Sequence, residues 1–176
     1  RAEVNWNIVK KKFKPGVDPY PGEYVEYAIE LSNASTHALG LLNISDVVLT
    51  DKLPEEAIFV EAYELPKNFS ERIPGTYDEK THTVRFDVES PDQRPGKDNT
   101  KEFRVIVKYP DWTEKVPGWH ENKNDLTEEE RAYLESIQQK KVTNEAHLSY
   151  VPLGEERQTK EASLTHGFTL DIASPW

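Results

Sequence analysis

The chain of 176 residues contains no cysteine and no methionine, and it has no long hydrophobic run. Without cysteine it has no disulfide, no Cys-ligated zinc or iron–sulfur cluster and no thiol nucleophile. No stretch approaches the about 20 apolar residues that a membrane-spanning helix requires, so we expect no membrane insertion by this fragment. A chain that begins at Arg1 without an initiator methionine is expected to be a mature or excised part of a longer protein.

The chain also has fewer basic residues than acidic ones. The chain has 22 Lys and Arg against 32 Asp and Glu, a formal net charge of −10. Nucleic-acid binding draws on clustered Lys and Arg, so we expect no nucleic-acid partner. The five histidines lack the close spacing of metal ligands, and there is no P-loop, dinucleotide-binding or G-x-S-x-G pattern. The sequence therefore predicts no metal, no cofactor and no enzyme that acts by turnover.

The dominant pattern that is present is the alternation of apolar and polar residues, which is typical of β-strands with one buried face. It occurs at residues 25–31, 47–53, 83–88, 103–107 and 142–150, and a last strand is expected over 162–170. Pro-Gly pairs at 15–16, 21–22 and 74–75 supply turns between the runs. About seven short strands at this spacing predict an all-β chain that forms an antiparallel sandwich. We expect residues 1–176 to form a single domain.

Residues 111–141 break the alternation and predict an inserted helix. Thr127 and Glu130 have the spacing of a capping box, with acidic residues in the first turn. Tyr133, Leu134 and Ile137 then form a narrow apolar stripe. The sequence therefore predicts one α-helix over about 127–140, within an insertion at about 111–141 between two strands.

Three polar residues fall on apolar faces of predicted strands. Lys11 alternates with Val9 and Phe13, Asp51 with Leu49 and Leu53, and Asn144 with Val142 and Ala146. Burying such groups requires compensating partners. Because Lys10 and Lys12 flank Lys11, a shift of one residue in register would move the choice of lysine to the other face.

Four segments in order resemble the Ig-like repeats of bacterial surface proteins and the isopeptide-forming domains of Gram-positive pilin backbones. They are the run PGEYVEYAI at 21–29, Ser32-Asn33, VLTDKLP at 48–54 and VTNEA at 142–146. The resemblance spans about residues 9–150 and departs from the pattern at the helical insertion. It implies an extracellular Ig-like β-sandwich of a bacterial cell surface or cell wall, used as a stalk or spacer beside neighbouring domains of the same protein.

The resemblance also implies roles for the three buried polar residues. Lys11 would be the nucleophile, Asn144 the electrophile and Asp51 the acid that shuttles protons. A desolvated lysine presents a neutral amine, and a protonated acid polarises the asparagine carbonyl, so that the amine displaces ammonia and a Lys–Asn amide forms. The alternative is a noncovalent polar cluster, with the lysine reaching solvent, Asp51 at a turn and Asn144 satisfying backbone groups.

Two tryptophans of the insertion, Trp112 and Trp119, are the candidate ligand-binding residues. Exposed aromatic rings stack on sugars or contact proteins, whereas buried ones hold a loop against the sandwich. We expect a structural stalk module of an adhesin or pilus-like protein. The alternative is an adhesin module that contacts a host protein or glycan through the helix and these tryptophans.

Overall fold

The computed structural model of the chain describes residues 6–12, 16–33, 44–67, 71–89 and 100–172, and for Trp6–Lys12, Asn33 and Ile44 it describes the backbone alone. The strands are β1 (Trp6–Lys12), β2 (Tyr24–Asn33), β3 (Ile44–Lys52), β4 (Ile58–Leu65), β5 (Ile73–Pro74), β6 (Thr76–Asp78), β7 (Thr83–Val88), β8 (Lys101–Lys108), β9 (Val142–Pro152) and β10 (Gln158–His166). Two short 3₁₀ segments (Trp112–Lys115 and Lys123–Asp125) and helix α1 (Glu128–Gln138) lie between β8 and β9.

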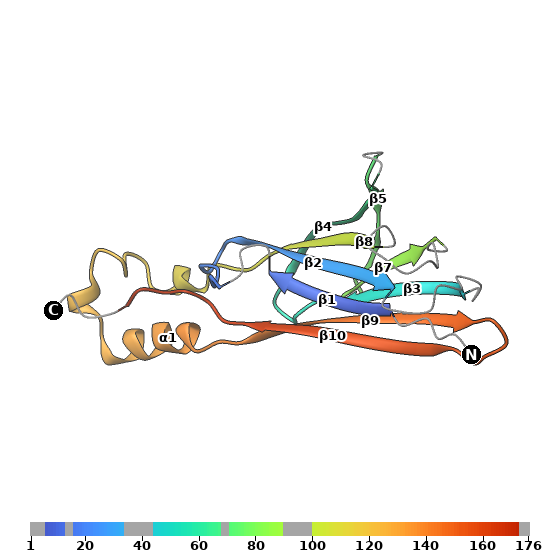
Figure 1. Cartoon of the computed structure of the whole chain (residues 1–176). Coiled ribbons are helices and arrows are strands. Elements are labelled where there is room, and N and C mark those ends of the chain that lie inside the picture. The colour runs from blue at the N-terminus through green and yellow to red at the C-terminus, as the bar shows by residue number, and fades with distance from the viewer. Residues whose placement is uncertain (1–5, 13–15, 34–43, 68–70, 90–99, 173–176) are drawn as a thin grey trace.

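The strands form two five-stranded sheets, in the orders β1-β2-β8-β4-β5 and β10-β9-β3-β7-β6. All strand pairs are antiparallel. β1 of the first sheet lies beside β10 of the second, so that the two sheets come together along that side (Figure 1). The prediction of an all-β antiparallel sandwich with one helix is confirmed.

The core lies between the sheets and is built by the alternating residues. In β2, for example, Val25, Tyr27, Ile29 and Leu31 are buried and the residues between them are half-buried. The opposite sheet contributes Leu49, Val84 and Leu148, among others. Phe86 and Phe103 meet edge to face across the two sheets, with ring centroids 4.9 Å apart. Each such side chain contributes about 2 kcal/mol through burial, so the period-two pattern is what drives the sandwich to form.

Helix α1 begins as predicted. Thr127 Oγ1 accepts a hydrogen bond from the Glu130 backbone N–H at 3.0 Å, and Glu130 Oε1 accepts one from the Thr127 N–H at 2.9 Å. Leu134 and Ile137 pack into a second apolar cluster with Val116, Leu170 and Ile172. The last strand therefore ends at His166, earlier than the predicted 170, because the chain beyond it turns to α1 instead of continuing the sheet.

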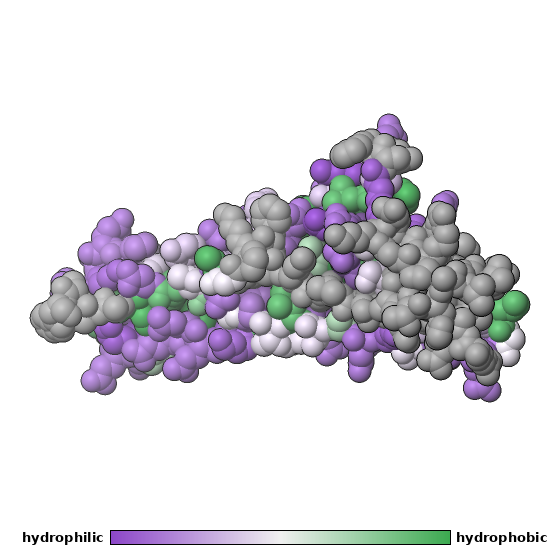
Figure 2. All heavy atoms as spheres, viewed as in Figure 1, coloured by the Kyte–Doolittle hydropathy of each residue, from purple (hydrophilic) through white to green (hydrophobic). Residues whose placement is uncertain are grey.

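The segment after β10 runs along α1. Arg131 donates to the carbonyl of Ile172 at 3.3 Å, and Gln138 donates to that of Leu170 at 2.9 Å. The molecule is elongated, with α1 and this segment at one end and the β9–β10 turn at the other (Figure 1). Figure 2 shows hydrophilic side chains over α1 and apolar ones where the helix meets the neighbouring segment. No helix among the described residues is long and apolar enough to span a membrane.

Candidate functional site

Asp51 and Asn144 lie inside the sandwich, on neighbouring strands of the second sheet. Asp51 of β3 is paired with Ala146 of β9, and Asn144 lies two residues before Ala146. Both residues are 0% exposed. Residues two apart in a strand share a face, so the carboxylate and the amide are diagonal neighbours, with about 7–8 Å between the α-carbons of such pairs. The structure thus brings together the predicted acid and the predicted electrophile.

The amide of Asn144 has an unusual environment. Within the part of the chain that the structure describes, neither its Nδ2 nor its Oδ1 has a hydrogen-bond partner. Burying a polar group in this way costs about 1–3 kcal/mol. Asn144 therefore does not satisfy backbone groups at a strand end, as the noncovalent alternative required of it.

A chain of buried hydroxyl and imidazole groups lies in the same region. Tyr27 Oη is 2.7 Å from Tyr109 Oη and 2.7 Å from His166 Nε2. The other ring nitrogen of His166, Nδ1, is 2.9 Å from the backbone oxygen of Gly167. These groups come from β2, from the residue after β8 and from the end of β10, so that the chain crosses from one sheet to the other.

The direction of these hydrogen bonds follows from the carbonyl of Gly167. A carbonyl oxygen only accepts, so His166 Nδ1 carries a proton and donates it. In the neutral ring Nε2 then accepts from the hydroxyl of Tyr27, and Tyr109 donates to the Tyr27 oxygen. If His166 gains a second proton, Nε2 becomes a donor and the two tyrosine bonds reverse. The group is therefore a two-state chain of hydrogen bonds.

Both tyrosines hold their protons tightly. Burial raises the pKa of Tyr109 to about 12, an effect that the hydrogen bond with Tyr27 reduces and the negative charge of Asp51 increases. Burial is also the main cause that raises the pKa of Tyr27 far above its usual range, followed by Tyr109, with Asp51 adding to the shift. Both hydroxyls are thus protonated at neutral pH, and both feel the charge of Asp51.

The register of β1 bears on which lysine belongs to this site. Lys11 is paired with Ala28, whereas Lys10 and Lys12 are paired with Ile29 and Tyr27. Ile29 and Tyr27 are fully buried, and Ala28 is half-buried. Register partners in an antiparallel pair occupy the same face. Positions 10 and 12 thus share the face of the core residues, and position 11 shares the other; the assignment of Lys11 as nucleophile stays a prediction.

The two tryptophans of the insertion are packed against the protein. Trp112 is half-buried and lies edge to face with Phe168, at 4.9 Å between ring centroids, while Lys140 Nζ is 4.8 Å from the centre of its ring. Trp119 is half-buried beside the cluster under α1 and stacks on His120 at 4.4 Å. Both rings hold the insertion in place, and ligand binding by them stays a prediction.

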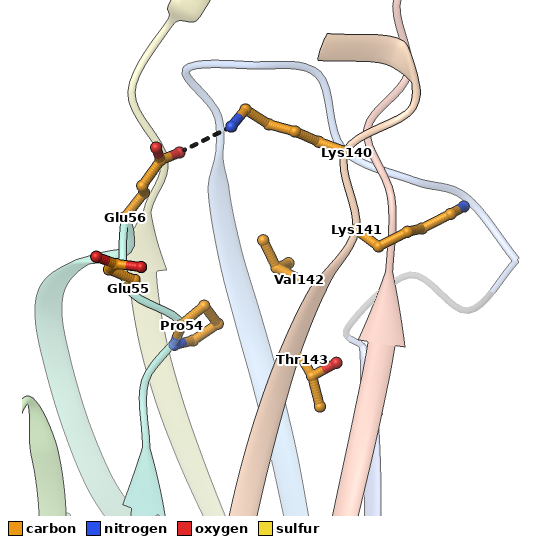
Figure 3. A pocket seen from close by; sticks show the side chains of 7 residues that line it. All are labelled: Pro54, Glu55, Glu56, Lys140, Lys141, Val142 and Thr143. Atoms are coloured by element: carbon orange, nitrogen blue, oxygen red, sulfur yellow. Dashed lines mark ion pairs between the residues drawn. The ribbon is translucent and has the colours of Figure 1, made fainter. Parts of the chain in front are cut away.

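A pocket of about 310 Å³ lies at the end of the strands that carry Asp51 and Asn144 (Figure 3). It is lined by Pro54, Glu55, Glu56, Lys140, Lys141, Val142 and Thr143. Lys140 Nζ points at Glu56, 3.3 Å from its Oε2, whereas Lys141 extends away from both glutamates. The ion pair joins the β3–β4 turn to the end of α1. Among the described residues no group of three His, Asp or Glu side chains is arranged to hold a metal ion.

The sequence reasoning missed Tyr27, Tyr109 and His166 as parts of this site. A signal for His166 was available: it falls in phase with the apolar residues Leu164 and Phe168 of the predicted last strand, and a histidine on such a face requires partners. Tyr27 and Tyr109 carried no signal of their own, because a buried tyrosine in an alternating strand is ordinary core.

No family profile matches the sequence, and no curated protein sequence matches it. The fold, in contrast, is similar to that of several solved structures. The major pilin subunit BcpA of Bacillus cereus aligns at a TM-score of 0.55 and 15% identity, over 94% of this chain and 41% of that one. The major pilin SpaD of Corynebacterium diphtheriae aligns at 0.53 and 8% identity, over 91% and 34%. The RrgA Jo.In complex aligns at 0.53 and 10% identity, over 93% and 79%.

At these identities the comparisons establish the fold: the chain has the Ig-like sandwich that also occurs in pilin and adhesin domains. The chain spans about two fifths of the B. cereus pilin subunit and a third of the C. diphtheriae pilin.

Proposed function

We propose that this chain is a structural module of a bacterial cell-surface pilus or adhesin, and that an amide bond between a lysine of β1 and Asn144 locks it. The module would lie outside the cell, in series with neighbouring domains of the same protein. Its bond would form once, without turnover, and it would need no cofactor.

The observation that carries the proposal is the environment of Asn144. Its amide is fully buried, has no hydrogen-bond partner among the described residues, and lies diagonally across from the buried carboxyl of Asp51. A buried amide without partners destabilises a core, so selection for an ordinary core would favour an apolar residue there. The arrangement is accounted for if the amide is a reactant. The fold shared with major pilins supports the same conclusion.

In the reaction, the uncharged Nζ of the lysine attacks Cγ of Asn144. A bond forms between Nζ and Cγ, and the bond between Cγ and Nδ2 breaks. The Nδ2 group leaves as ammonia, taking its own two hydrogens and one from the lysine amine. A protonated Asp51 would hydrogen-bond to the Asn144 carbonyl oxygen and stabilise the charge that develops there. Proximity in the folded core supplies most of the rate.

Of the three adjacent lysines we propose Lys12 as the nucleophile. It is the register partner of Tyr27, whose hydroxyl feels the charge of Asp51, whereas the register partner of Lys10 is Ile29 and that of Lys11 is Ala28. Lys11 remains the choice that the family resemblance implies, and the experiment below separates the two.

The bond would have a mechanical purpose. β1 belongs to the first sheet and β9 to the second, so an amide between them would tie the two sheets together. In this cysteine-free chain it would constrain the unfolded state as a disulfide does, without depending on redox conditions.

Intact mass spectrometry tests the proposal. We expect the purified chain to be lighter than its sequence by one ammonia, and we expect Asn144→Ala and Asp51→Ala to show their full calculated masses. Asn124→Ala, at an exposed asparagine, is the matched control and should still lose ammonia. A full sequence mass for the unaltered chain would refute the bond.

Single substitutions identify the lysine. Lys12→Arg should abolish the loss of ammonia, because arginine is not nucleophilic at neutral pH, while Lys11→Arg should leave the loss intact. The reverse result would assign the bond to Lys11, and peptide mapping of the crosslinked fragment gives an independent answer.

The alternative function, a module that binds a host protein or glycan through Trp112 and Trp119, has less support. Both indoles are half-buried in contacts with the chain itself, which limits the ring surface that a ligand could cover.

A further inference from the structure

The amide-forming reaction leaves one requirement open. A lysine enters the core as an ammonium ion and must lose a proton before it attacks. Asp51 is a poor acceptor for that proton if it is itself protonated to polarise the carbonyl of Asn144. The site therefore needs a second group that takes the proton and later returns it to the leaving nitrogen.

The hydrogen-bond chain supplies such a group. Tyr27 Oη lies 2.7 Å from His166 Nε2, and the carbonyl of Gly167 holds Nδ1 as a donor, so that in the neutral ring Nε2 is free of a proton. Tyr27 is the register partner of Lys12 on the neighbouring strand. His166 shares the inner face of β10 with Leu164, which is the register partner of Asn144. Tyr27 and His166 thus connect the strand of the nucleophile to the strands of the electrophile.

We propose that His166, acting through the hydroxyl of Tyr27, takes the proton from the attacking lysine and returns it to the departing ammonia. This inference rests on the amide-forming reaction proposed above. His166 is in this sense a positioning residue, because it reaches the reacting atoms only through Tyr27, and Tyr109 completes the chain by donating to the Tyr27 oxygen.

One Nζ–H of the ammonium breaks as its proton moves to Tyr27 Oη, and at the same time the proton of Tyr27 moves to His166 Nε2. The products are a neutral amine, an unchanged tyrosine and an imidazolium. When the Cγ–Nδ2 bond of Asn144 breaks, the transfer runs in reverse: the imidazolium gives its proton to Tyr27, and Tyr27 gives one to the leaving nitrogen. The attacking amine loses a second hydrogen as the amide forms, and this hydrogen also goes to the leaving nitrogen, which departs as an ammonium ion with its own two hydrogens and these two. No oxidant or reductant takes part.

Several charged or titratable groups lie around His166, its partner Tyr27 and the neighbouring Gly167. They are Tyr27 on β2, Tyr109 after β8, Asp51 on β3, Lys141 before β9 and Asp18 before β2. A Cβ added to Gly167 would lie 3.0 Å from Lys141 Nζ and 3.3 Å from Asp18 Oδ2, so those two opposite charges lie beside the residue that follows His166.

The test is the rate of ammonia loss during refolding. Chain recovered from inclusion bodies in denaturant is diluted into buffer between about pH 5 and 8, the range over which an ordinary histidine titrates. Samples are quenched in acid at intervals, and intact mass gives the fraction that has lost ammonia. For the unaltered chain we expect a rate that rises with pH, because only the neutral imidazole accepts a proton.

Two variants and one control complete the experiment. Tyr27→Phe should slow ammonia loss by about tenfold or more. His166→Gln, which accepts the hydrogen bond of Tyr27 but takes up no proton, should slow it comparably and remove the rise with pH. The control is Tyr150→Phe, which removes another buried hydroxyl that donates to Gln158 Oε1 at 3.2 Å on β10. It should react at the unaltered rate with the unaltered pH profile.

The outcomes separate this inference from the proposed function. If the unaltered chain never loses ammonia, the proposed function fails. If it loses ammonia but folded Tyr27→Phe or His166→Gln keeps its rate and pH profile, the relay is refuted while the bond stands. Circular dichroism reports whether each variant folds. Should Tyr27→Phe not fold, a pH-independent rate in the unaltered chain would overturn the relay equally.

Discussion

A buried acidic side chain lies at each end of the sandwich interior, and the two have different partners. At the end away from α1, Glu64 of β4 is 8% exposed and its Oε2 lies 3.6 Å from Nζ of Lys101. Lys101 is paired with Leu31 at the end of β2, and Glu64 with Phe103, so both lie on inner faces. At the α1 end, Asp51 lies beside the amide of Asn144 and close to the two tyrosines.

The difference shows what each arrangement accomplishes. An ion pair such as Glu64–Lys101 offsets part of the desolvation of both charges by their mutual attraction, and nothing further is required of it. An amide carries no charge that a partner could neutralise, and it needs hydrogen bonds. The ion pair thus satisfies both of its charges, whereas the amide of Asn144 has no hydrogen-bond partner among the described residues, which the proposed reaction would account for.

Replacing Asn144 by leucine gives the largest expected effect, and its sign decides the comparison. If the amide bond forms, Asn144→Leu removes a crosslink that closes a loop of more than a hundred residues and should destabilise the chain by about 4 kcal/mol. If no bond forms, the same change replaces an unsatisfied amide by an apolar side chain and should stabilise it. Urea unfolding of both chains measures the difference.

Alkaline titration gives the next largest effect. An unfolded tyrosine has a pKa of about 10, and burial raises the pKa of Tyr109 to about 12 in the folded chain. A raised folded pKa means that the stabilisation is fully present below about pH 10 and is lost as the pH rises toward 12. We expect Tyr109 alone to lower the free energy of unfolding by about 2 kcal/mol over this interval.

Two variants sharpen that measurement. Tyr109→Phe should reduce the fall between pH 10 and 12 without abolishing it, since phenylalanine has no proton to lose while burial also raises the pKa of Tyr27. Tyr24→Phe, which is 63% exposed, is the control and should leave it unchanged. An equal fall in all three chains would show that the hydroxyl of Tyr109 does not contribute to it.

Breaking the ion pair at the other end should have a smaller effect. Glu64→Gln leaves the charge of half-buried Lys101 without its counter-charge and should destabilise the chain by about 1 kcal/mol, less than for a fully buried pair. The loss of ammonia should be unaffected. Asp87→Asn, in the exposed pair with Arg85 at 3.0 Å, should change stability by less than about 0.5 kcal/mol. If Glu64→Gln blocked the loss of ammonia, the two ends would not be independent.

Much of this fold could be predicted because its strands are buried on one face only. β2, β7, β8 and β9 follow the period-two rule, and the capping box marks the start of α1. Strand β4 was not predicted, and the reason is physical. Its register shifts between Phe59 and Glu61, and Ala62, Tyr63 and Glu64 are buried in succession, so a bulge and a two-sided environment erase the alternation.

The site was predictable in part. Asp51 and Asn144 stood out as polar residues on apolar faces, and both are buried. The face of β1 was not decidable from the sequence, because three lysines follow one another and only the pairing with β2 distinguishes them. The contacts among Tyr27, Tyr109 and His166 join residues more than 80 positions apart, and no local pattern records such contacts.

The segment beyond β10 determines how tension would enter the molecule. Because Arg131 and Gln138 bind the carbonyls of Ile172 and Leu170, and these two side chains fill the cluster under α1, a pull on the chain beyond Ile172 loads the helix contacts before it reaches the strand. Those contacts would break first, and the segment they hold would then extend by a short distance. In the proposed surface module, the helical insertion would then take up the first part of an applied load before the strands of the sandwich are stretched.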